Sequence, residues 1–231
     1  MQNGPQLRHL LETTYAKTIF DSTEIAGLIQ DREFLDSLKT GKLIQKEANN
    51  QWTFSGFAKV QIAIRALQLG EPQRAILQAL TWQEFEEFVA CVFTFHDFEV
   101  HHRFRFSTNR RFEIDIVAGR NPIMFCVDCK QYGVRLGKTA ALKTASEEQL
   151  SRTKTLATNF VRFQTQLGCL DWQKPLLTPL LVTMLHEDIQ FHEQIPIVPA
   201  ARLNAFILNF EERLDNLQVI RPSNARQQRL I

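Results

Sequence analysis

The sequence has few cysteines, no long hydrophobic run and almost no net charge. Its four cysteines and the absence of a secretory leader favour the reducing cytoplasm over an oxidising compartment. The apolar runs are far shorter than the ~20 residues that cross a bilayer, so we expect no membrane partner. The net charge of +2 is too small to indicate a partner. We find no internal repeat and no low-complexity segment.

The sequence also lacks a clear zinc or redox motif. Cys126 and Cys129 form a CxxC pair, but both lie in a predicted strand, where a separation of three places the side chains on opposite faces. We therefore interpret them as buried thiols. The six histidines show no ligand spacing beyond His101 and His102, which strand geometry also separates.

The remaining composition, 44% hydrophobic and 23% charged, is that of a globular protein. A change of pattern near residues 70–72 predicts a boundary, and we place the domains at 1–75 and 76–231. The first domain is predicted to have three short helices, a β-hairpin with an Asn-rich tip and a helix over 56–69. This order is typical of a winged helix; a helical bundle with an incidental loop is the alternative.

The second domain is predicted to be α/β. Thr81 and Glu84 form a capping box that begins a helix. The elements expected after it are strands over 98–106, 111–118 and 123–130, a helix over 138–163, a buried strand over 176–185, a helix over 200–214 and an edge strand over 217–220. The sequence therefore predicts an α/β fold with a mixed central sheet flanked by helices, preceded by a small winged-helix-like α+β domain.

Three charged residues lie within two apolar segments of the second domain, Asp115 in the first and Asp128 and Lys130 in the second. Burying such charges is costly without a partner, which indicates that the chain uses them. Strand alternation places Asp128 and Lys130 on one face. If the strands pair through the turn at 119–122, Asp115 projects at the same end of the sheet. The alternatives are a solvent-facing acid for Asp115 and an intrastrand ion pair for the other two residues.

Two adjacent carboxylates raise each other's pKa unless a cation lies between them. Mg²⁺ suits such a site because it prefers oxygen ligands and retains several waters, and Mn²⁺ could replace it. The cation would polarise a phosphate and lower the pKa of an attacking water, which Lys130 would orient. We therefore expect Asp115 and Asp128 to hold a metal ion, with no small-molecule cofactor.

Glu86 is a further candidate for a metal ligand and catalytic residue. It lies on the flank of the apolar stripe of its predicted helix, whereas Glu87 points to solvent. A surface glutamate is the alternative. Glu113 shares a predicted face with Asp115 and Val117, and we interpret it as a structural or supporting residue.

Basic residues cluster beside these acids, and no acid interrupts the arginines between positions 103 and 111. A basic surface next to a carboxylate site suits a polyanionic substrate, with a solvated face as the alternative. The residues predicted to contact nucleic acid are Arg103, Arg105, Arg110, Arg111, Gln131, Lys138 and Lys143.

A helical acid followed by the pattern D-x12-D-x-K resembles the PD-(D/E)XK nuclease superfamily. The segment WQEFEEFVACVF is similar to the opening helix of Mrr-type restriction endonucleases. EIDIVAG and VDCKQ are similar to those enzymes and to archaeal Holliday-junction resolvases. The resemblance implies a restriction-endonuclease-like fold and a Mg²⁺-dependent endodeoxyribonuclease. In it Asp115, Asp128 and Glu86 bind the metal and Lys130 assists hydrolysis.

A winged helix before this nuclease fold is also similar to the Mrr domain order. The winged helix would dock on duplex DNA mainly through phosphates. Because each site cuts one strand, double-strand cleavage would need a homodimer. Two alternatives keep the fold: a non-catalytic DNA-binding or regulatory protein, and a transposition or recombination component that acts beside a partner.

Overall fold

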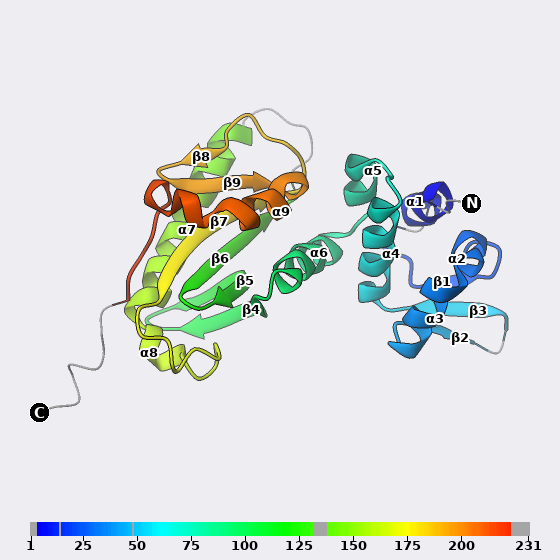
Figure 1. Ribbon diagram of the computed structural model, residues 1–231, viewed down its shortest axis with the longest axis horizontal. Coiled ribbons are helices and arrows are strands. Elements are labelled where there is room, and N and C mark those ends of the chain that lie inside the picture. Colours follow the sequence, from blue (N-terminus) through cyan, green and yellow to red (C-terminus); the bar gives the residue numbers. More distant parts are fainter. Residues whose placement is uncertain (1–3, 14, 48, 132–137, 223–231) are drawn as a thin grey trace, which may run out of the picture. The chain divides into compact units, whose positions relative to one another are not determined.

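The computed structural model describes residues 4–13, 15–47, 49–131 and 138–222. The chain forms two compact units, Met1–Phe88 and Val89–Ile231 (Figure 1). The division lies within helix α6 (Trp82–Phe95), beyond the change of composition near residue 70. The limits 1–75 and 76–231 stay predictions. Among the described helices, none combines the length and the hydrophobicity needed to span a bilayer.

The first unit contains five helices before α6 and a small antiparallel sheet of order β1-β3-β2, counted over its described residues. Its elements are α1 (Gly4–Thr13), β1 (Ile19–Asp21), α2 (Ala26–Gln30), α3 (Arg32–Thr40), β2 (Ile44–Lys46), β3 (Gln51–Phe54), α4 (Gly56–Gln68) and α5 (Gln73–Gln78). The predicted helices and hairpin are present. Strand β1 was not predicted, because three residues are too few to show an alternation, and neither was the short helix α5.

Side chains at the helix starts explain where several elements of the first unit begin. Asp31 accepts a hydrogen bond from the backbone of Phe34 at the start of α3, and Ser55 does the same for Ala58 at the start of α4. The predicted capping box is confirmed, because Thr81 and Glu84 bond reciprocally at 3.3 and 2.7 Å.

The second unit is built on a six-stranded mixed sheet of order β4-β5-β6-β7-β9-β8. Its elements after α6 are β4 (Glu99–Ser107), β5 (Arg111–Arg120), β6 (Ile123–Lys130), α7 (Lys138–Thr158), α8 (Phe160–Phe163), β7 (Leu176–Thr183), β8 (Phe191–His192), β9 (Ile195–Pro199), α9 (Ala200–Asn209) and the 3-10 helix η1 (Glu211–Asn216). Strands β4, β5 and β6 pair antiparallel, whereas β6, β7 and β9 run parallel. The predicted mixed sheet flanked by helices is confirmed.

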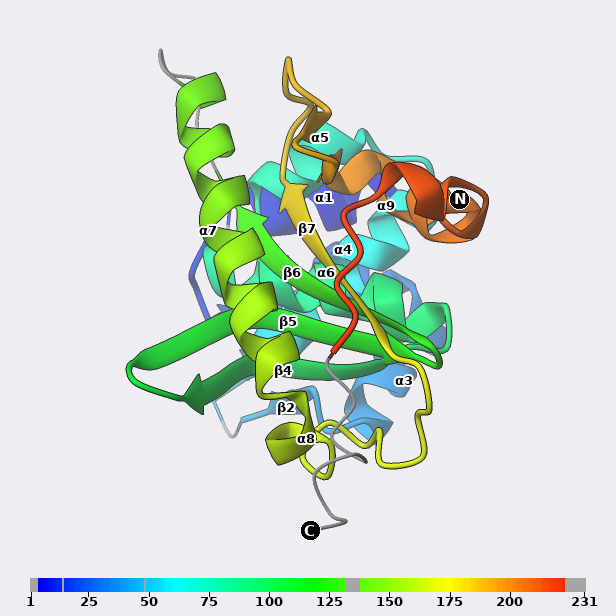
Figure 2. The ribbon, with the colours of Figure 1, turned by 90° about the vertical axis from the view of Figure 1, so that its left-hand side faces the viewer.

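The two faces of this sheet are covered differently. Helix α7 packs on one face against β5, β6 and β7 (Figure 2), where Cys126 of β6 and Leu156 of α7 belong to one buried cluster. On the other face Phe125 lies 5.7 Å from Phe93 and 5.0 Å from Phe210, measured between ring centroids. The central strand β6 is therefore buried from both sides.

The prediction for the second unit differs from the structure at 195–199, at 138–163 and at 217–220. The segment 195–199 was not predicted as a strand because it holds two prolines, which are rare within strands, yet it pairs parallel with β7. The helix expected over 138–163 is divided into α7 and α8. The edge strand expected over 217–220 is a single bridge between Leu177 and Ile220.

Candidate active site

The two central acids lie where β5 and β6 cease to pair. The β5–β6 ladder ends at the pair Ile116 and Val127. Asp115 and Asp128 are the next residue beyond that pair on β5 and on β6, respectively. The Asp115 carboxylate reaches β6, where its Oδ2 accepts a hydrogen bond of 2.8 Å from the backbone N–H of Cys129. The structure thus brings together the two acids that the sequence singled out.

The carboxylate of Asp128 forms ion pairs with two cationic side chains. The Asp128 side chain is 5% exposed; Lys130 Nζ lies 2.7 Å from its Oδ2 and Arg152 Nη1 lies 2.9 Å from its Oδ1. Strand alternation placed Asp128 and Lys130 on one face, and their contact follows from it. The intrastrand ion pair that was the alternative interpretation is therefore present.

The pKa of Asp115 is raised to about 6. Burial is the largest cause and the negative charge of Asp128 is the second, while the Cys129 N–H, Lys130 and Arg152 oppose the rise. The carboxylate is thus incompletely neutralised by the protein, and a bound cation would relieve this.

Arg152 is not among the site residues predicted from the sequence. It comes from α7, whose inward face carries the fully buried polar residues Ser146, Gln149 and Thr153. The spacing of these polar residues, three and four apart, could have indicated a buried polar face of the helix. Such residues need polar partners, which here lie on the sheet.

The donor set fits a hard divalent cation, since two carboxylates with retained waters suffice for Mg²⁺. In the described part of the chain, no three His, Cys, Asp or Glu side chains are grouped so that they could hold a metal ion. Glu86, in the first unit, is 3% exposed, so the surface alternative is wrong. Its role as a ligand stays a prediction. Glu87, expected in solvent, is half-buried.

Glu113 does not follow the regular alternation predicted for β5. It bonds to Arg105 across the hairpin, with Oε2 2.6 Å from Nε. Ile114 and Val117 are three residues apart, yet both join the core cluster beneath α7. Arg103 on the paired strand has a φ of 46°. The alternation is therefore interrupted here, and the single shared face predicted for Glu113, Asp115 and Val117 is wrong.

The predicted nucleic-acid contacts lie in three places. The pairing of β4 with β5 continues to Ser107 and Arg111, beyond the last pair of β5 with β6. The β4–β5 hairpin therefore extends past β6 at the end of the sheet where Asp115 and Asp128 lie (Figure 2). It carries the exposed side chains of Arg103, Arg105, Arg110 and Arg111. Lys143 is exposed on α7.

The other two predicted contacts are half-buried. Gln131 Nε2 lies 3.8 Å from the sulfur of Met184. Lys138 is 17% exposed in its side chain and bonds at 2.7 Å to Glu187, whose side chain is 7% exposed. We infer that Lys138 has a structural role that the sequence did not indicate.

Part of the chain matches a known protein family. Residues 77–154 match the sequence model of the restriction endonuclease family Mrr_cat. An uncharacterised protein of Archaeoglobus fulgidus is 31% identical over 131 residues, which are 56% of this chain and 92% of that protein. The chain belongs to the Mrr-type restriction endonuclease family. The part that matches the Mrr model includes both acids, Lys130 and Arg152.

Two solved structures are similar at low identity. Protein VC1899 from Vibrio cholerae is 16% identical with a TM-score of 0.37, over 93% of this chain and 52% of its own. The protein of unknown function AF1548 is 17% identical with a TM-score of 0.31, over 55% of this chain and 65% of its own. The Mrr-type chain therefore spans about half the length of the first and about two thirds of the second.

Proposed function

We propose that this Mrr-type protein is a divalent-metal-dependent DNA endonuclease that hydrolyses phosphodiester bonds. The observation that carries the proposal is the meeting of Asp115 and Asp128 at the end of the β5–β6 pairing, with Lys130 bound to Asp128. Membership of a restriction endonuclease family supports the same chemistry.

Asp115 and Asp128 would hold Mg²⁺, or Mn²⁺ in its place. The cation would polarise the scissile phosphate and lower the pKa of the attacking water. Lys130, whose ammonium already lies at Asp128, would orient that water and stabilise the negative charge that develops on the phosphate. Glu86 is the proposed additional ligand.

The arginine-bearing β4–β5 hairpin supports DNA as the substrate. Its exposed guanidinium groups extend from the sheet at the end where the acids lie. Arginine binds phosphate through paired N–H donors, so these residues would position the backbone rather than read bases. We propose that residues 1–75 form a winged-helix-like domain that adds DNA or protein contacts. We also propose that a homodimer would be needed to cut both strands.

The test is cleavage of supercoiled and branched DNA with Mg²⁺ or Mn²⁺ by the whole chain. The variants Asp128→Ala and Lys130→Ala should lose cleavage by orders of magnitude, while Lys174→Ala, at the far end of the sheet, should cleave normally. Equal cleavage by the Asp128 and Lys130 variants would contradict the proposal. The absence of cleavage on every substrate would instead favour a non-catalytic DNA-binding role or a recombination component.

A further inference from the structure

Both carboxylate oxygens of Asp128 are already engaged by cationic side chains. Lys130 lies at Oδ2 and Arg152 at Oδ1, at 2.7 and 2.9 Å. Lys130 belongs to the same strand as Asp128, whereas Arg152 comes from the helix that covers the sheet. The second contact therefore joins two separate elements.

Arg152 is fixed in this position by its own helix. Its Nη1 also lies 3.0 Å from Gln149 Oε1, and its Nη2 lies 3.2 Å from Glu148 Oε2. Gln149 is fully buried and donates from Nε2 to the carbonyl oxygen of Cys126 at 2.8 Å. A buried amide bound to the central strand thus orients the guanidinium toward Asp128. The Arg152 side chain is 25% exposed, so one side of it faces solvent.

A divalent cation at Asp128 would compete with this arrangement. It would need a carboxylate oxygen that Arg152 or Lys130 now contacts, and both side chains would repel it. Lys130 is two residues away on the same strand and stays beside the site. Arg152 is the side chain that can withdraw without changing the strand, because it approaches from α7 and is partly in solvent.

We propose that Arg152 is a positioning residue that couples uptake of the divalent cation to the arrival of DNA. Without DNA it holds Oδ1 of Asp128 and keeps the affinity for the cation low. A DNA phosphate offers the guanidinium a partner with two acceptor oxygens, so Arg152 transfers to the phosphate and releases Oδ1. Binding of the cation and of DNA then favour each other reciprocally. This inference rests on the metal site of the proposed function.

The experiment measures Mn²⁺ affinity by calorimetry on the whole chain, with and without a short phosphorothioate DNA duplex. Without DNA, Arg152→Met should bind Mn²⁺ at least about tenfold more tightly than the wild type, because a positive charge about 5 Å from the cation is removed. The duplex should raise the affinity of the wild type by a larger factor than that of the variant.

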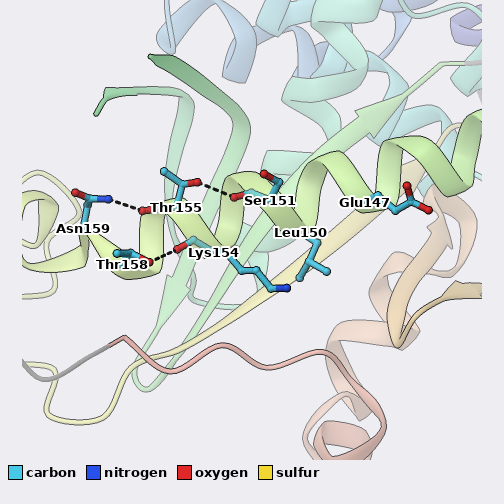
Figure 3. Close-up of a pocket in the computed structure, with 7 residues that line it drawn as sticks. All are labelled: Glu147, Leu150, Ser151, Lys154, Thr155, Thr158 and Asn159. Carbon is cyan, nitrogen blue, oxygen red and sulfur yellow. Dashed lines mark hydrogen bonds between the residues drawn. The ribbon is translucent and has the colours of Figure 1, made fainter. Parts of the chain in front are cut away.

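Lys154→Met is the matched control, because it removes one positive charge two residues further along α7. Lys154 is exposed and is one of the residues that line the pocket in Figure 3, and the Lys154 carbonyl accepts a hydrogen bond from Thr158. Its Mn²⁺ affinity should equal that of the wild type. An increase as large as that of Arg152→Met would show a general charge effect and would overturn the inference.

Competition and simple anchoring predict opposite results. If Arg152 only anchored Asp128, its loss would lower both the unfolding temperature of the metal-free protein and the Mn²⁺ affinity. Competition lowers the first and raises the second. Unchanged or weaker Mn²⁺ binding by Arg152→Met overturns the inference. If that variant does not fold, Arg152→Lys replaces it, because the shorter lysine side chain has a single ammonium group that cannot bridge Gln149 and Asp128. It should shift the affinity in the same direction by a smaller factor.

The proposed function and this inference fail in different ways. If neither the wild type nor the variants bind Mn²⁺, the proposed metal site is wrong and the inference falls with it. If Mn²⁺ binds equally to the wild type and to both Arg152 variants, the inference alone is overturned. If the expected shift in Mn²⁺ affinity occurs but no DNA is cleaved, Arg152 has the proposed role and the proposal of nuclease activity is wrong.

Discussion

The carboxylate of Asp115 caps the open end of the neighbouring strand, because its Oδ2 accepts the backbone N–H of Cys129 at 2.8 Å. One acid thus completes the backbone hydrogen bonding of the sheet where β5 and β6 separate. It also presents its charge to Asp128.

Asp115→Asn should stabilise the metal-free protein at alkaline pH. The pKa of Asp115 is raised from 3.8 to about 6 in the folded state. The wild type therefore loses stability as the pH rises from about 4 to about 6. The amide oxygen can still accept the Cys129 N–H. At pH 8 the variant should be more stable by at most about 3 kcal/mol, and the difference should vanish near pH 4.

Urea unfolding in EDTA at pH 4, 6 and 8 measures this difference. Asp171→Asn, at an exposed position, is the control and should show no pH-dependent gain. A lower stability of Asp115→Asn at pH 8 would contradict the prediction.

Lys138→Ala should reduce stability rather than DNA affinity. It would leave the carboxylate of Glu187 buried without its partner at 2.7 Å, and breaking a buried pair costs about 3 kcal/mol. The double variant Lys138→Met with Glu187→Leu should recover part of this loss. Urea unfolding and a DNA titration with all three proteins give the comparison. A stable Lys138→Ala variant with weakened DNA binding would restore the nucleic-acid role predicted from the sequence.

Arg110→Ala and Arg111→Ala should each weaken DNA binding in a salt-dependent way. Each phosphate contact contributes about 0.9 to the slope of log affinity against log salt concentration. Each substitution should therefore lower the slope by about one. Fluorescence anisotropy between 50 and 200 mM salt provides the slope. Lys174→Ala, an exposed change before β7 at the opposite end of the sheet, serves as the control. Slopes unchanged in the arginine variants would remove the hairpin from the DNA interface.

Cys126 and Cys129 should resist alkylation in the folded protein. Burial raises the pKa of the Cys126 thiol to about 12, and Cys129 is 3% exposed. Iodoacetamide at pH 8 should modify the partly exposed Cys91 first, and all four cysteines in urea. Peptide mass spectrometry distinguishes the sites. Rapid native labelling of Cys126, or a disulfide between it and Cys129, would show that the CxxC pair is accessible.

The sequence predicted most of the second unit because its strands are long enough to show a pattern. The alternation of Phe104 and Phe106 with Arg103 and Arg105 reappears as buried and exposed positions. Strand β9 was missed because Pro196 and Pro199 indicate a loop locally, whereas the parallel pairing with β7 depends on residues distant in the chain.

The site was predictable where neighbours along a strand determine it. Asp128 and Lys130 meet because they are two residues apart on one strand. Arg152 could not be selected in this way, because its contact with Asp128 depends on how α7 lies across the sheet. The contact of Lys138 with Glu187 could not be predicted for the same reason, since nothing near Lys138 in the sequence indicates Glu187.

The unlike coverings of the central sheet imply that different conditions will loosen its two faces. The aromatic face, with Phe93, Phe125 and Phe210, depends on apolar burial, which weakens on cooling and in urea. The α7 face includes the directional bonds of Gln149 and Arg152, so pH and ionic strength should act there. Hydrogen exchange should therefore show α7 opening separately from the elements of the aromatic face. This helix would then be the covering of the sheet that responds to pH and ionic strength.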